Sequence, residues 1–372
     1  MKVGFLVNPI AGMGGKVGLK GTNGVAEKAL EMGADPIAPQ RAIDFLRKIK
    51  ALGLTEEIEL ITCPGVMGEE EAHSTGFSCL ILPMRIAAKT TAEDTKESVK
   101  LMIKQEADLI VFVGGDGTAR DILDALPTPS STLVLGVPAG VKMYSGIFAI
   151  NPEEAAYVVE ALAKKESQFA DFEIVDVDES NVRQDRINIR LYGFLRGPFV
   201  PMRVQGSKQV SPETLDENEN QRAVARFIAE QLDPKATYIL GPGTTVKCVA
   251  ELLDVRKTLL GVDIYRAGRL TKDVNEDQLL REVSDWQKTW IIVSPIGRQG
   301  VLFGRGNQQI SPKIIRLVGR GKIIVLATRG KIQSIEGGTL RVDTGIVEVD
   351  DMLRGYIKVA IDYREWRVLP IR

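Results

Sequence analysis

A short apolar run that leads directly into glycines constrains the fold of this chain more than any other feature. The run at 108–113, Asp-Leu-Ile-Val-Phe-Val, is followed by Gly-Gly-Asp-Gly-Thr at 114–118. Large apolar residues without alternating polar ones are typical of a strand that is covered on both faces, as in a parallel sheet. Residues 119–125 then predict a helix, so the glycines connect a buried strand to a helix N-terminus.

The glycines and the acid among them predict a phosphate site that also carries out chemistry. Glycine N–H groups have no Cβ beside them and can approach a phosphate closely, and a helix N-terminus favours anions. A turn that only held phosphate would avoid the negative charge of Asp116. A carboxylate is expected there if it binds Mg²⁺ or takes a proton from an attacking hydroxyl. The alternative is a strand–turn–helix junction whose glycines only allow tight packing, because short glycine motifs often occur without a ligand.

Composition argues against several classes of function. The 372 residues carry 48 Lys and Arg against 49 Asp and Glu, so no excess positive charge supports nucleic acid or an anionic membrane as a partner. No apolar run has the length of a membrane span, and no signal-peptide pattern is present. His73 is the single histidine, which argues against a Ser-His-Asp triad or a multi-histidine metal site and favours a carboxylate as any base. Three scattered cysteines without metal-ligand spacing fit a reducing cytoplasm.

Strand and helix signals alternate along the first half of the chain. Such alternation predicts a doubly wound parallel sheet, in which ligands bind at the carboxyl ends of the strands. We therefore expect an α/β domain over residues 1–168. Its strands are expected at 2–7, 58–62, 79–82, 108–113 and 132–136, and its helices at 39–52, 91–105, 119–125 and from the Asn151-Pro152 cap onward.

The second half is expected to form a β-rich domain over residues 169–372. Its short segments of strand character are separated by many Gly and Pro residues, and 172–177 and 187–194 are predicted to pair. The polar stretch 205–221 predicts a mobile loop or an insertion, followed by a helix at 221–231. A return of the C-terminal segment to the first domain is left open. Further strands are expected at 236–240, 289–293, 323–327 and 340–342.

Another glycine-rich turn follows the first expected strand. It contains Asn8, Pro9, Gly12 and Gly14, and two lysines lie shortly after it. The turn forms neither the Gly-x-Gly-x-x-Gly dinucleotide fingerprint nor a P-loop. It is either a plain turn or an amide with backbone donors that face a nucleotide phosphate. We expect it beside 114–118, because both follow strands of one parallel sheet.

Similar turns occur in the second half. Ser294 and Gly297 follow an apolar strand, and 304–309 places an arginine and an asparagine beside glycines. These groups could bind a phosphate, a ribose or an amide-bearing base, and a series of β-turns is the alternative. Residues 241–245 are either an anion site or the start of a capped helix.

These segments together resemble the superfamily of NAD kinases, diacylglycerol and sphingosine kinases and, more distantly, phosphofructokinases. The motif at 114–118 is similar to their shared signature, and Asn8-Pro9-x-Ala-Gly is similar to the lipid-kinase branch. Over most of its length the chain resembles the ATP–NAD kinase-like proteins of archaea and bacteria, which include acetoin-catabolism-associated members. The matching stretches are 8–24, 114–118, 136–142, 272–276 and 303–312.

The resemblance implies an NAD kinase with its active site between an α/β domain and a β-rich one. It implies phosphoryl transfer from ATP or polyphosphate to the 2′-hydroxyl of the adenosine ribose of NAD, giving NADP, with Mg²⁺ as cofactor. Asp116 inherits the role of catalytic base, and Mg²⁺ is expected to bind through the phosphates with Asp116 as a candidate ligand. The expected cofactor-binding residues are Asn8, Pro9, Gly12, Gly14, Gly114, Gly115, Gly117, Thr118, Asn275, Glu276, Ser294 and Gly297.

Two departures from the family pattern concern the acceptor. Asn275-Glu276 stands for the Asn-Glu/Asp pair of typical NAD kinases, and it is equally a helix cap followed by a first-turn acid. Ser294-Pro-Ile-Gly297 keeps half of a second family motif, after which Arg298-Gln299 replaces the rest.

Other functions therefore stay open. One is a kinase of a lipid, a sugar or a small keto or hydroxy compound, and another is a nucleotide-binding regulator without activity. A low aromatic content of 6% and the lack of an amphipathic membrane-binding stretch argue against a lipid. We expect a cytoplasmic homo-oligomer with NAD and nucleotide substrates and without nucleic-acid or membrane partners.

Overall fold

The structure, a computed structural model, divides by its internal contacts into two units. The first contains Met1–Met13 and Gly21–Lys208, and the second contains Gly14–Lys20 and Gln209–Arg372. Within the described part of the chain, no helix has both the length and the apolar character needed to cross a membrane. The residues described are 1–15, 26–87, 89–127, 130–140, 143–177, 189–200, 203–204, 215–297 and 299–372.

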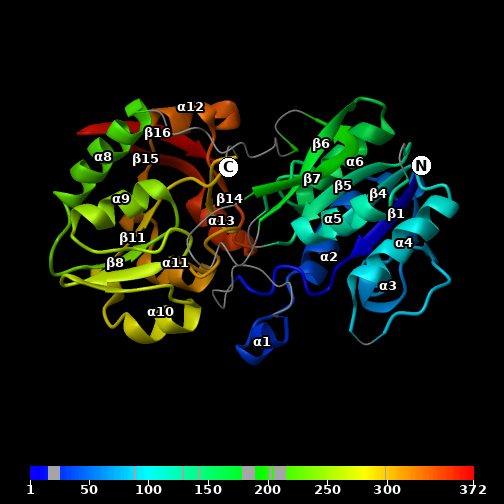
Figure 1. Cartoon of the computed structure of the whole chain (residues 1–372), viewed down its shortest axis with the longest axis horizontal. Coiled ribbons are helices and arrows are strands. Elements are labelled where there is room, and N and C mark those ends of the chain that lie inside the picture. The colour runs from blue at the N-terminus through cyan, green and yellow to red at the C-terminus, as the bar shows by residue number, and fades with distance from the viewer. Residues whose placement is uncertain are drawn as a thin grey trace. The chain divides into compact units, whose positions relative to one another are not determined.

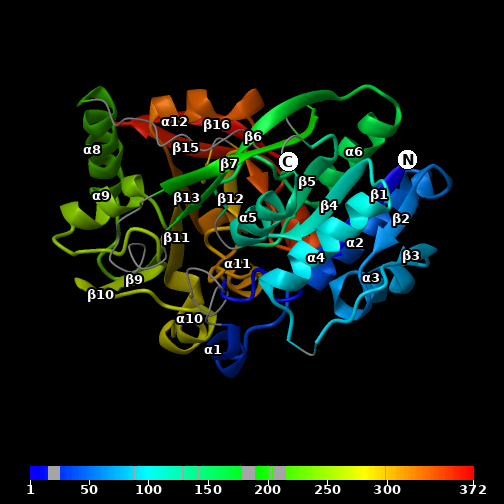
Figure 2. The same cartoon turned by 45° about the vertical axis from the view of Figure 1, so that its right-hand side comes forward.

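Five parallel strands form the sheet of the first unit in the order β3-β2-β1-β4-β5. Figure 1 labels β1, β4 and β5, and Figure 2 labels all of these strands. β1 pairs with β2 on one side and with β4 on the other, so the order of the strands reverses between β1 and β4. This is the expected doubly wound sheet, and the pair β1–β4 is its topological switch point. The strands are β1 (Lys2–Val7), β2 (Glu59–Thr62), β3 (Cys79–Ile81), β4 (Leu109–Gly114) and β5 (Leu133–Pro138).

Helices cover both faces of this sheet, which explains why its strands are mostly apolar. Phe5 of β1 stacks on Phe45 of one helix with ring centroids 5.9 Å apart. A Cβ on the preceding residue, Gly4, would lie 2.7 Å from the Met102 sulfur of a helix on the opposite face. The helices are α1 (Ala26–Glu31), α2 (Ala38–Ala51), α3 (Glu69–Ser74), α4 (Ala92–Lys104), α5 (Asp116–Ala125) and α6 (Pro152–Ala163).

A long antiparallel hairpin belongs to the first unit, although a boundary after residue 168 would assign it to the second. It consists of β6 (Gln168–Val177) and β7 (Ile189–Phe199), which pair as expected and lie beside α5 and β5 (Figure 2). Phe172 and Leu195 are buried in the same core as the sheet. Gly197 lies so close to the Val134 carbonyl that a Cβ would overlap it. The hairpin is therefore packed into the first unit.

The second unit is built on a seven-stranded mixed sheet in the order β10-β9-β8-β11-β13-β15-β16. β8, β11, β13 and β15 are parallel, and the outer strands are antiparallel to their neighbours. The C-terminal strands are thus part of this sheet. The strands are β8 (Thr237–Leu240), β9 (Asp263–Arg266), β10 (Arg269–Thr271), β11 (Thr289–Val293), β13 (Ile323–Leu326), β15 (Gly355–Asp362) and β16 (Glu365–Ile371), with the separate pair β12 (Val301–Phe303) and β14 (Arg341–Val342).

Helices also cover both faces of the second sheet. Tyr238 and Leu240 pack in one core with α8 and α9, whereas the intervening Ile239 packs in another with α10, α11 and α13. α8 begins at Leu215, so the end of the polar stretch expected as a loop or insertion is helical, and 205–214 lie outside the described residues. The helices are α8 (Leu215–Ala229), α9 (Thr244–Leu252), α10 (Glu276–Glu282), α11 (Pro312–Val318), α12 (Arg329–Ser334) and α13 (Val347–Leu353).

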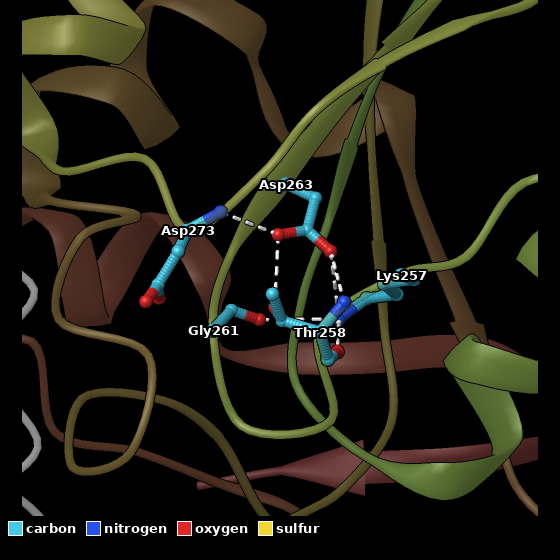
Figure 3. A network of polar contacts seen from close by, with 5 residues as sticks. All are labelled: Lys257, Thr258, Gly261, Asp263 and Asp273. Carbon is cyan, nitrogen blue, oxygen red and sulfur yellow. Dashed lines mark hydrogen bonds and ion pairs between the residues drawn. The ribbon is translucent and has the colours of Figure 1, made fainter. Parts of the chain in front are cut away.

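A buried ion pair holds the loop between α9 and β9 (Figure 3). Lys257 Nζ lies 3.6 Å from Asp263 Oδ2, and both side chains are fully buried. Lys257 also donates to the carbonyls of Thr258 at 2.7 Å and Gly261 at 3.1 Å. Asp263 accepts from the Thr258 N–H and hydroxyl and from the Asp273 N–H. The pair therefore satisfies the backbone groups of a loop that has no regular secondary structure.

Candidate functional site

Two of the expected site segments meet where β1 and β4 end. The Asn8 N–H donates to the Val113 carbonyl at 2.9 Å, and the Asn8 amide nitrogen donates to the Thr118 hydroxyl at 2.9 Å. The Asn8 side-chain oxygen accepts from the Ile10 N–H at 3.3 Å, which closes the turn after β1. The amide of Asn8 thus connects the two turns at the switch point of the sheet, where ligands bind in folds of this kind.

The turn after β5 adds a third segment to the same edge. The N–H groups of Ala139 and Gly140 both donate to the Gly114 carbonyl. Gly12 has a positive φ of 81°, and a Cβ there would overlap the Ala139 carbonyl oxygen. A Cβ on Gly115 would lie 3.4 Å from the Gly140 Cα, which is an ordinary van der Waals contact between the two turns.

The motif at 114–118 is mostly helical in the structure. β4 extends to Gly114, Gly115 is the cap, and α5 begins at Asp116, three residues earlier than expected. A Cβ on Gly114 would lie 2.6 Å from the Thr118 hydroxyl oxygen, so this position needs glycine for the tight turn. Gly117 and Thr118 lie in the first helical turn, where backbone N–H groups have no partner within the helix and can bind an anion.

Asp116 is buried, with 6% of its surface exposed, and its carboxylate is held from both sides. Oδ2 accepts from the Tyr144 N–H at 2.7 Å, and Oδ1 accepts from the Ser145 N–H at 2.9 Å. Burial, and then the negative charge of Asp116, raise the pKa of Tyr144 to about 12. The two N–H groups suit an ionised carboxylate, which can only accept hydrogen bonds. Tyr144 and Ser145 were not expected in the site, since a backbone donor leaves no pattern in the sequence.

The site can accommodate a magnesium ion by its chemistry. Mg²⁺ is commonly held by one or two carboxylates together with substrate phosphates. Among the residues that the structure describes, no group of three or more His, Cys, Asp or Glu side chains could hold a metal, so a dedicated protein cage is not found there. Asp116 can serve as the single carboxylate, since carboxylate oxygens are ligands that Mg²⁺ prefers.

The expected acceptor-reading residues in the second unit have structural roles. Asn275 caps α10 by accepting from the Gln278 N–H at 2.9 Å, the Gln278 side chain accepts from the Asn275 N–H, and Glu276 lies in the first turn. Ser294 follows β11 and is buried, and Gly297 has a φ of 66° in the tight turn that the Ile296 N–H closes on the Val301 carbonyl. Arg298 lies outside the described residues.

The other second-half turns are internally bonded in a similar way. The buried Asn307 amide donates to the Leu302 carbonyl at 2.7 Å and accepts from the Gly304 N–H at 3.1 Å. Gly243 precedes α9 with a φ of 117°, and its N–H donates to the Leu259 carbonyl. Gly14 belongs to the second unit, and Pro9 lies in the turn after β1. Among the expected site residues, Asn8 and 114–118 are the ones that hydrogen bonds bring together at one edge of a sheet.

Two family models match most of the chain. Residues 3–167 match the ATP-NAD kinase N-terminal domain, and residues 234–371 match the ATP-NAD kinase C-terminal domain. No curated protein matches the chain. The first model ends before the β6–β7 hairpin, although the hairpin is packed into the first unit of the structure.

Proposed function

This chain belongs to the ATP-NAD kinase family, and on that premise we propose that it transfers a phosphoryl group from ATP to the 2′-hydroxyl of the adenosine ribose of NAD, giving NADP. ATP and NAD are the substrates that the family implies. The observation that carries the proposal is the carboxylate of Asp116 at the start of α5, beside the glycines of 114–118. A carboxylate within a phosphate-binding turn suits a reaction in which a hydroxyl attacks a phosphoryl group.

Each residue at this edge has a role in the proposed reaction. The N–H groups of the first turn of α5 bind phosphate oxygens, and the glycines let the phosphate approach the backbone. Asn8 orients the Thr118 hydroxyl, which remains able to donate to a phosphate. Asp116 orients the ribose hydroxyl and accepts its proton as the oxygen attacks phosphorus. When bound, Mg²⁺ neutralises charge on the phosphoryl oxygens, with Asp116 as its proposed protein ligand.

The test is NADP formation by the purified protein with Mg²⁺, NAD and either ATP or polyphosphate. Asp116→Asn should lower the rate by about 100-fold or more, because it removes a general base. Asp124→Asn is the matched control, since Asp124 lies on the same helix with an exposed side chain. Near-normal turnover by Asp116→Asn would contradict the role of Asp116 as the catalytic base. Turnover of a donor with another acceptor but not with NAD would exclude NAD as the substrate.

Three further properties of the protein are proposed from its sequence. We propose that polyphosphate can replace ATP as donor, that the protein is cytoplasmic, and that it is a homo-oligomer. The first is tested in the assay above. Light scattering during size-exclusion chromatography tests the third, and a mass equal to the 40.7 kDa of one chain would contradict it.

A further inference from the structure

The β6–β7 hairpin contacts the segment that holds Asp116. The Gly146 N–H donates to the Glu173 carbonyl of β6 at 3.0 Å. Two residues further along β6, the Ser145 hydroxyl donates to the Val175 carbonyl at 2.9 Å and accepts from the Val175 N–H at 3.1 Å. Alternate residues of a strand direct their backbone groups to the same side, so Ser145 continues the pairing that Gly146 begins. One hydroxyl thus satisfies both backbone groups of a strand residue at the edge of the hairpin.

Ser145 joins this hairpin to the carboxylate through its own backbone. Its side chain binds β6, while its N–H donates to Asp116 Oδ1. The residue is 1% exposed, so water does not compete for these bonds. The neighbouring Tyr144 N–H donates to the other oxygen of Asp116. The two donors fix the plane of the carboxylate, and their position depends on where Ser145 is held.

A second contact joins the next residue of β6 to the helix that carries Asp116. Arg120 Nη1 lies 3.0 Å from Asp176 Oδ2, and both side chains are partly buried. Arg120 is about one helical turn beyond Asp116 on α5. Consecutive residues of β6, Val175 and Asp176, therefore hold the carboxylate through Ser145 and the helix through Arg120.

We propose that Ser145 is a positioning residue, which holds the Asp116 carboxylate in its reactive orientation by anchoring it to β6. This inference rests on the catalytic role proposed for Asp116. A displacement of a catalytic group by about 1 Å can lower the rate about 100-fold. Loss of the Ser145 hydrogen bonds should therefore lower kcat. In the proposed function the substrates bind through the glycines and the free N–H groups of the first turn of α5, whereas the hydrogen bonds of Ser145 go to the Asp116 carboxylate and to Val175. Binding should therefore be little changed.

Ser145→Ala is expected to lower kcat about 10-fold or more while KM for ATP and NAD changes less than about twofold. Ser98→Ala is the matched control, because Ser98 is also a fully buried serine of the first unit and its hydroxyl donates to the Asp94 carbonyl. It should lose stability without loss of kcat. Ser145→Cys keeps the shape of the side chain but replaces the hydroxyl by a somewhat larger thiol, which is a weaker hydrogen-bonding group, so it should show the same change even if the alanine variant does not fold. Wild-type kcat in a folded Ser145 variant would overturn the inference.

Hydrogen exchange separates this inference from the proposed function. The N–H groups of Tyr144 and Ser145 should exchange slowly in the intact protein and about 10-fold or more faster in the folded Ser145 variant. If the wild-type protein forms no NADP with either donor, the proposed function fails, and faster exchange still supports the anchor. If NADP forms normally while exchange or kcat is unchanged by the substitution, the anchor fails and the proposed function stands.

Discussion

Replacing Lys257 with methionine should destabilise the second unit by about 3–5 kcal/mol, the range seen when one partner of a buried ion pair is removed. The variant leaves Asp263 as a fully buried charge 3.6 Å from where the ammonium was. It also leaves the carbonyls of Thr258 and Gly261 without the donor that Figure 3 shows. Three donors still bind Asp263, so the loss should lie at the lower end of the range.

The tryptophans allow this loss to be measured in the second unit alone. Trp286, Trp290 and Trp366 are all the tryptophans of the chain, and all lie in that unit. Urea unfolding followed by tryptophan fluorescence therefore reports its free energy of unfolding. Lys288→Met is the control, because Lys288 pairs with Asp285 at 4.0 Å with both side chains exposed, and such pairs contribute at most about 1 kcal/mol.

The double variant Lys257→Met, Asp263→Asn tests whether the unpaired charge of Asp263 causes the loss of stability. Removing the charge of Asp263 as well should recover part of the loss, since the uncompensated charge is its main cause. A loss below about 1 kcal/mol in Lys257→Met, or one no larger than in Lys288→Met, would refute the argument.

Two more predictions concern the first unit. Burial raises the pKa of Glu71 from 4.5 to about 7, so the stability that its protonated form provides is present below pH 4.5 and is lost as the pH rises through 7. Glu71→Gln should therefore raise stability at pH 8 by roughly 3 kcal/mol and flatten the pH dependence in urea unfolding followed by circular dichroism, and an unchanged pH dependence would contradict this. Gly12→Ala should reduce NADP formation more than Gly33→Ala, because both glycines have a positive φ but only Gly12 meets a carbonyl oxygen, and equal activities would contradict the contact.

Much of the first unit could be predicted because its local signals agree with its tertiary structure. The apolar run before Gly114 is a buried strand, and Asn151 caps α6 through its side chain as expected. The Thr91 cap with Asp94 also forms the expected capping box of α4. In each of these places the pattern that determines the element lies within a few neighbouring residues, so it can be recognised from a short stretch of sequence.

Elements held by distant contacts were harder to predict. The start of α8 is rich in acids and asparagine, which favour turns, yet Asn220 in this helix donates to the Ile361 carbonyl and accepts from the Arg329 N–H. Likewise, β6 and β7 pair as predicted, but their packing on α5 and β5 depends on contacts such as Gly197 with Val134. The backbone donors to Asp116 belong to this class, because their partner lies 28 and 29 residues earlier in the chain.

The way Asp116 is held also determines how much sequence change the site can tolerate. One of its oxygens is bound by the main chain of Tyr144, and the main chain is the same for nineteen of the twenty amino acids. The identity of the side chain at 144 is therefore largely free with respect to this bond, and proline is the exception. A search for such sites by their side chains would overlook a contribution that a peptide group makes.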